Sequence, residues 1–191
     1  MGLNIYHLYT LQEITRLKDI ILHTFNDTLT GKLYRTSLEL FFIELGLSPT
    51  GHWDISTVDL LTTPSLIKAS MLFIKQHNIA LKHYLTTPLL RDNDIFIMDA
   101  LLQLELSPQE LRACNHCRIF LKVSRLSEIT TGNGDSISEE AWLGQIMLPK
   151  HSDNTWPIYP KPPHSTWTIW QKCISRAFIR GRRKVRTFLG K

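Results

Sequence analysis

Apolar residues recur at every third or fourth position along much of this chain, the spacing that places side chains on one face of an α-helix. These runs predict helices that start near residues 10, 32, 64, 92 and 107, with a last one over residues 167–179. The segment 47–62 lacks the pattern and is expected to be a loop with at most one short turn. The predicted fold class is therefore mainly α, with little β structure.

Local signals sharpen several of these boundaries. Ser107-Pro-Gln-Glu110 is a capping box with proline at the first helical position, so two independent start signals coincide there, and the helix is expected to continue to about Leu126. Gly46 follows the second run and suits the left-handed residue that ends many helices. Gly132-Asn-Gly134 predicts a turn with short strands on either side, the one β element expected.

The chain divides by composition into three parts. We predict a helical domain over residues 1–148 and a basic helix rich in Trp and Arg over residues 167–191. Residues 149–166 between them carry five of the nine prolines, which predicts an extended linker. With 191 residues, 43% of them hydrophobic, the chain is long enough to bury a core.

The sequence as a whole also gives indications of the cellular location of the protein. No apolar stretch reaches the roughly 18 residues that a membrane span requires, and the N-terminal residues lack the pattern of a secretory signal. The three cysteines are an odd number, which favours reduced thiols. We therefore expect an intracellular protein, in the cytoplasm or the nucleus, without a membrane span.

Positive charge is concentrated at the C-terminal end. Residues 171–191 carry eight Lys or Arg and no Asp or Glu, so a total net charge of +5 leaves −3 for the first 170 residues. If a helix continued across Gly181, Lys172, Arg176, Arg180 and Arg183 would form one basic face. The residues predicted to contact an RNA or DNA backbone are Lys172, Arg176, Arg180, Arg182, Arg183, Lys184 and Arg186.

Two other interpretations of this tail stay open. The apolar side of the helix, which includes Trp167 and Trp170, could dock on the body and leave the arginines merely solvated. A basic amphipathic helix can also lie on an anionic membrane or fill a groove of a partner protein.

Catalytic and metal chemistry find little support in the sequence. Cys114 and Cys117 would share one helix face, but a structural zinc site needs four ligands and no second pair has matching spacing. We expect the two thiols to pack as small apolar groups. Asp92, Asp94 and Asp99 could hold Mg²⁺, yet the first two are explained more simply as helix-start residues. No cofactor, no metal site and no catalytic residue is predicted.

Several stretches together resemble a known family. They are "RDNDIFIMD", "LRACNHCRIFLKVSRLSEITTGNGDSI" with the "AW" that follows, and "WPIYPKPPHSTWTIWQKCI" before an ending in "LG". They are similar to the region just downstream of the polymerase core in reverse-transcriptase polyproteins of non-long-terminal-repeat retroelements. The resemblance covers residues from about 90 to 191, roughly half of the chain.

The resemblance implies a role beside a polymerase. The paired aspartates of the polymerase motif are absent, so the catalytic residues of the family do not carry over to this chain. The implied function is a non-catalytic segment, like a thumb or a connection, that contacts nucleic-acid backbone next to the rest of the polyprotein. The alternative is a helical interaction module that docks on a partner protein through the proline-rich arm and the Trp helix.

Overall fold

The computed structural model describes residues 7–49, 54–79, 91–145, 156–187 and 189–190, and it confirms a mainly α fold. Short antiparallel bridges supply the β structure of this described part, including the predicted turn element at 130–137. In chain order the helices are α1 (Leu8–Thr24), α2 (Leu29–Leu45), α3 (Ile55–Leu61), α4 (Leu66–Gln76), α5 (Ile97–Leu102), α6 (Pro108–Leu121), the 3-10 turn η1 (Leu126–Ile129), α7 (Glu139–Leu143) and α8 (His164–Phe178).

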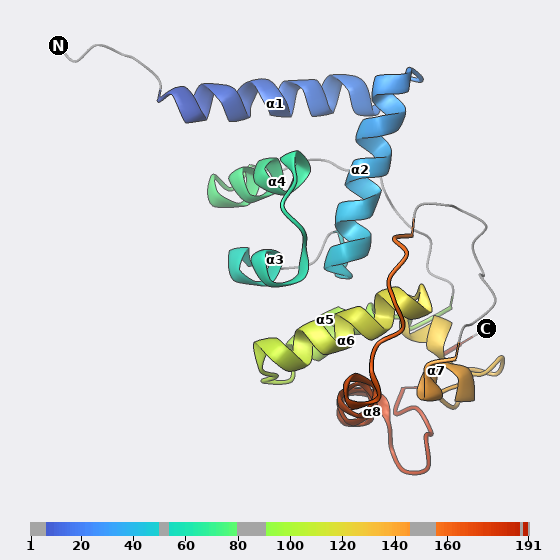
Figure 1. Cartoon of the computed structure of the whole chain (residues 1–191). Helices are drawn as coiled ribbons and strands as arrows, with labels where there is room; N and C mark the ends of the chain where they lie inside the picture. The colour runs from blue at the N-terminus through green and yellow to red at the C-terminus, as the bar shows by residue number, and fades with distance from the viewer. Residues whose placement is uncertain (1–6, 50–53, 80–90, 146–155, 188, 191) are drawn as a thin grey trace.

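The helices form an upper and a lower group (Figure 1). In the upper group α1 lies across the top, α2 descends from its end, and α3 and α4 pack beside α2. In the lower group α5 and α6 lie side by side, and α8 packs beneath them. The contact of α6 with α8 is the most extensive between any two helices of the described chain.

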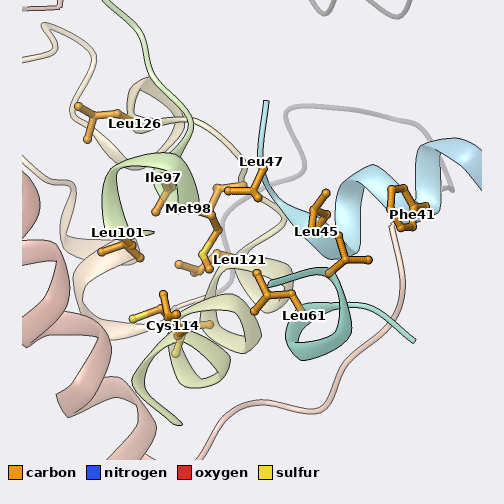
Figure 2. Close-up of a cluster of buried hydrophobic side chains, with 14 of the residues drawn as sticks. Phe41, Leu45, Leu47, Leu61, Ile97, Met98, Leu101, Cys114, Leu121 and Leu126 are labelled. Carbon is orange, nitrogen blue, oxygen red and sulfur yellow. The ribbon is translucent and has the colours of Figure 1, made fainter. Parts of the chain in front are cut away.

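One apolar core joins the two groups (Figure 2). Leu45 at the end of α2, Leu47 just after it and Leu61 of α3 lie against side chains of the lower helices. The lower helices contribute Met98 from α5 and Cys114 from α6, both fully buried. Burial of this apolar surface is the main favourable term for the fold.

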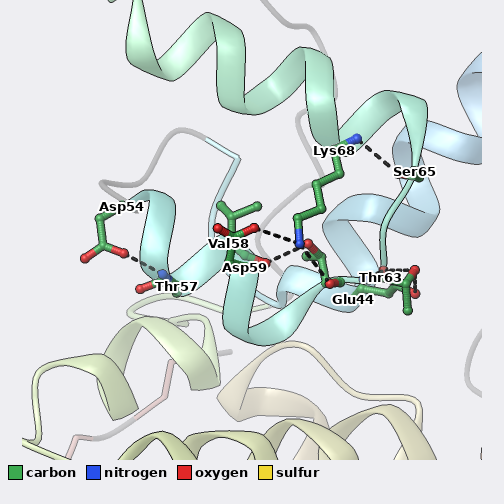
Figure 3. A network of polar contacts seen from close by, with 9 residues as sticks. Glu44, Asp54, Thr57, Val58, Asp59, Thr63, Ser65 and Lys68 are labelled. Atoms are coloured by element: carbon green, nitrogen blue, oxygen red, sulfur yellow. Dashed lines mark hydrogen bonds and ion pairs between the residues drawn. The ribbon is translucent and has the colours of Figure 1, made fainter.

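Polar side chains set the boundaries of the upper helices. The segment predicted to be a loop contains α3, because Asp54 accepts a 2.6 Å hydrogen bond from the Thr57 backbone N–H and so caps a helix. Helix α4 starts after Ser65 instead of Thr63. Thr63 donates from its N–H and its hydroxyl to Glu44, which leaves the capping position to Ser65 (Figure 3).

The start of α5 also differs from prediction. Neither Asp92 nor Asn93 caps it, because the helix begins at Ile97 and the preceding residues form a turn with Asn93 at a φ of 59°. The buried Asp94 carboxylate instead accepts hydrogen bonds from the N–H and the hydroxyl of Ser127, at 3.0 and 2.7 Å. This acid ties the turn before α5 to η1.

Helix α6 begins as predicted and ends early. The capping box of Ser107 and Glu110 is confirmed, with both reciprocal hydrogen bonds formed. The helix ends at Leu121, not near residue 126, because Lys122 adopts a left-handed conformation with a φ of 56°. Gly46 ends α2 in the same conformation, with a φ of 68°, as predicted.

Candidate functional site

Helix α8 is anchored by its tryptophans. The Trp170 indole Nε1 donates a 3.0 Å hydrogen bond to the Ala141 carbonyl oxygen of α7, and Trp167 Nε1 donates to the Pro162 carbonyl oxygen at 3.1 Å. Both rings are buried, so the apolar side of α8 belongs to the protein's own core. That side is therefore not available to a membrane surface or to a groove of another protein.

The opposite side of α8 is basic. Lys172 and Arg176 lie one turn apart and are exposed. The Lys172 ammonium forms a 3.2 Å ion pair with Glu110 of α6, an exposed contact that ties the two helices loosely. Arg176 continues the basic ridge toward the end of the helix.

The basic face predicted across Gly181 does not form, because α8 ends at Phe178. Gly181 adopts a φ of 71°, and Arg182 and Arg183 also have positive φ, so the chain reverses direction there. Residues 179–186 form an antiparallel hairpin, called the basic hairpin below, which contains the bridge between Ile179 and Val185. Helix α8 thus spans His164–Phe178, close to the helix predicted over residues 167–179, and the basic segment predicted to reach residue 191 is not one helix.

The basic hairpin has an inner and an outer face. Side chains alternate between the faces of an extended strand, and burial of the paired residues follows that rule, since Ile179 and Val185 are half-buried. Arg183, in the turn between them, is also half-buried, and its guanidinium carbon lies 5.5 Å from the centre of the Trp142 ring. The exposed outer side chains are Arg180, Lys184 and Arg186.

A second hairpin holds the basic hairpin in place. Residues 130–137, which contain the Gly-Asn-Gly turn, are called the glycine hairpin, and their ends pair through Thr130 and Ile137. Its far strand pairs with the basic hairpin through Ser136 and Lys184, with the Val185 N–H donating to the Asp135 carbonyl oxygen at 2.8 Å. Two turns far apart in the sequence thus form one small antiparallel unit.

The structure brings most of the predicted nucleic-acid residues to the surface. Arg183 is the exception, since its side chain covers Trp142 and is half-buried. The exposed members, called the basic surface below, are Lys172, Arg176, Arg180, Arg182, Lys184 and Arg186.

Sequence reasoning missed the role of Asn115 and Arg118 in the Cys-Asn-His-Cys-Arg run. The fully buried Arg118 guanidinium donates to backbone carbonyls of Ile43 and Glu44, at the end of α2, and to the Val123 carbonyl oxygen. Asn115 accepts from Arg118 and donates to the Glu44 carbonyl oxygen at 2.8 Å. Burial lowers the pKa of Arg118 to about 9, so the group stays charged near neutral pH.

These contacts place a positive charge at the negative end of the α2 dipole. The pair therefore links the upper helices to α6, and its role is structural. The signal in the sequence was an amide and a guanidinium three residues apart on one helix, but nothing local indicated that α2 would end there.

The three cysteines are buried between α6 and α8. Burial raises the pKa of the Cys117 thiol, and its Sγ donates to the Thr166 carbonyl oxygen at 3.8 Å. The described residues contain no group of three or more His, Cys, Asp or Glu side chains able to hold a metal ion. The Cys114–Cys117 pair contributes to packing.

The proline-rich segment is described from residue 156 onward, and the predicted boundary at 148–149 lies outside the described residues. Its described part packs on α6. The Tyr159 ring lies 5.6 Å from that of His116, and the Arg118 guanidinium carbon lies 5.9 Å from the centre of the Trp156 ring.

Comparisons with known proteins assign no family. A scan against protein-family models found no match, and searches of the curated proteins and of the solved structures found none either. Among the described residues, no helix combines the length and the apolar character needed to cross a membrane.

Proposed function

We propose that this chain is a non-catalytic, thumb- or connection-like segment of a retroelement reverse transcriptase, and that it contacts nucleic-acid backbone through the basic surface. The observation that carries the proposal is the basic hairpin. Its outer face presents Arg180, Lys184 and Arg186 to solvent, directly after the basic ridge of α8. The sequence resemblance supplies the context of a neighbouring polymerase.

The physical basis is electrostatic and independent of base sequence. Guanidinium and ammonium groups neutralise phosphates and release condensed counterions, so binding tolerates different sequences and weakens with salt. A site of this kind works best when a rigid scaffold holds its charges in position. The buried anchors of α8, Trp167 and Trp170, supply that scaffold together with the glycine hairpin.

The geometry gives less support to the alternative in which the chain docks on a partner protein than to nucleic-acid binding. It requires a free Trp helix and a free proline-rich arm, whereas both tryptophans of α8 are buried and the described part of the arm lies on α6.

A charge-matched pair of variants tests the proposal. The first replaces Arg176, Arg180 and Lys184 by Gln, avoiding Arg183, which covers Trp142, and Arg186, whose Nε donates to the Ile179 carbonyl oxygen. The second replaces three other exposed cations, Lys32, Arg112 and Lys161, by Gln. Equilibrium binding to labelled RNA and DNA should weaken for the first variant and stay near wild type for the second. Equal losses, or no binding by the wild type, would refute the proposal.

A further inference from the structure

Helix α1 carries several large apolar side chains that are exposed to solvent. Its exposed side chains include Leu8 and Leu22, with relative exposures of 81% and 62%, and Phe25 follows at the end of the helix with 65%. The helix lies at the top of the molecule, and α2 and α4 pack against its other side (Figure 1). Apolar surface of this kind usually marks an interaction site.

The helix is two-sided, and each side has its own periodic stripe. The inner stripe contains Glu13, Leu17 and Ile20, all buried. The outer stripe, defined here by its six exposed members, follows alternating steps of three and four residues, which is the spacing of a coiled-coil seam. Its members are Leu8, Leu11, Thr15, Lys18, Leu22 and Phe25.

The order of apolar and polar positions along the outer stripe is the same from either end. Two apolar residues are followed by two polar residues and then by two apolar residues. An antiparallel copy of α1 would therefore place Leu11 against Leu22 of the second copy and Thr15 against Lys18. This self-complementarity is what a two-fold symmetric interface requires, and it singles out a second copy of this chain over an unrelated partner.

The charges near the centre fit the same arrangement. The two-fold axis would pass between Thr15 and Lys18, which brings two Lys18 side chains and two Asp19 side chains close to it. Their formal charges cancel, so each Lys18 has a carboxylate of opposite sign within the same cluster. A partner with a uniformly basic or acidic helix would leave one of these charges uncompensated.

We propose that α1 is a self-association surface, through which two copies pair antiparallel by the outer stripe. One helix pair covers less area than a standard protein interface, so the dimer is reversible and depends on concentration. The proposal does not rest on nucleic-acid binding, because the basic surface lies on α8 and the basic hairpin.

Sedimentation of the full chain over a wide range of concentrations tests the surface. The wild type should pass from monomer to dimer, and Lys18→Asp should weaken the dimer, because it replaces the two cations of the central cluster by two further carboxylates. Leu11→Lys with Leu22→Lys should abolish it. The control, Leu143→Lys with Ile158→Lys, changes two exposed apolar residues elsewhere and should leave dimerisation unchanged. Circular dichroism on each variant verifies that the fold persists.

Disulfide trapping tests the orientation. Mixed chains carrying Leu11→Cys or Leu22→Cys, oxidised with diamide, should give mainly cross-links between one variant and the other. The three native cysteines are fully buried and should not compete. A wild type that stays monomeric overturns the proposal, whether or not it binds lipid vesicles or another protein. So does a dimer that the Lys variants leave intact, or cross-linking mainly between chains of the same variant.

Discussion

The Trp170 indole N–H and the Ala141 carbonyl oxygen form a 3.0 Å hydrogen bond in the interior, between α8 and α7. The contact is buried on both sides, since neither residue has measurable exposure. Because the basic hairpin begins directly after α8, and α7 directly follows the glycine hairpin, this bond joins the two helices next to the direct pairing of the two hairpins.

We predict that Trp170→Phe destabilises the protein by about 1–3 kcal/mol or more, because the Ala141 carbonyl loses its donor in a buried site. Urea unfolding would measure the change in the free energy of unfolding. Trp142→Phe serves as the control, since that side chain is half-buried and should tolerate the change better. Equal effects of the two substitutions would show that the Trp170–Ala141 hydrogen bond adds nothing measurable to the free energy of unfolding.

Gly46 should be intolerant of a side chain. Its φ of 68° disfavours any other residue by about 1–2 kcal/mol, and an added Cβ would lie 2.6 Å from the Arg118 guanidinium carbon. Gly46→Ala is therefore expected to lower the melting temperature. Gly132→Ala should have little effect, because nothing lies within 4 Å of the added atom there. A thermal melt of the two variants compares them, and a silent Gly46→Ala would contradict the packing described here.

The capping box of α6 has a titration signature. Hydrogen bonds from the Ser107 N–H and hydroxyl, with the Lys172 ammonium, lower the pKa of Glu110 to about 2 from an ordinary 4.5. Because the folded pKa is depressed, the stability from this carboxylate is present above about pH 4.5 and is lost as pH falls toward 2.

We predict that Ser107→Ala raises the pKa of Glu110 part of the way back to 4.5, since the backbone N–H remains as a donor. Lys172→Gln should raise it as well, because the ammonium both donates to the carboxylate and attracts its negative charge. Carboxyl NMR titration measures both values. A pKa of Glu110 that stays near 2 in either variant would contradict the contribution assigned to that partner.

The cysteines should be inert in the folded protein. All three are fully buried. The hydrogen bond with Cys173 and burial raise the pKa of the Cys114 thiol, and burial raises the pKa of the Cys117 thiol. The same hydrogen bond lowers the pKa of Cys173, so the inertness of that thiol rests on burial, which keeps the reagent away from its Sγ. A thiol-reactive disulfide reagent at neutral pH should label none of them in the native protein and all three in denaturant. Immediate labelling of one thiol without denaturant would indicate an opening of the α6–α8 contact.

Local chemistry in the sequence predicted much of the helical fold. The Ser107–Glu110 box and Gly46 act within one or two helical turns, so their signals are complete in a short window of sequence. The start of α4 was predicted less well, because Thr63 is engaged by Glu44, nineteen residues away. A capping residue can be recognised locally, but a competing partner cannot.

The candidate site shows the same limit. Composition pointed to the basic residues of the tail, but their arrangement depends on Gly181 and on pairing with residues 135–137. Periodicity within the tail could not reveal a partner strand more than forty residues earlier. Arg183 was therefore expected on the basic face, whereas its guanidinium lies over Trp142.

The slope of binding affinity against salt concentration tests the central claim most directly. For wild type, the logarithm of the association constant for RNA or DNA should fall linearly with the logarithm of salt concentration. The variant lacking the charges of Arg176, Arg180 and Lys184 should have a slope shallower by about 2–3, roughly one unit for each lost phosphate contact. The Lys32, Arg112 and Lys161 variant should keep the wild-type slope. An unchanged slope in the first variant, or binding that ignores salt, would contradict backbone recognition by the basic surface.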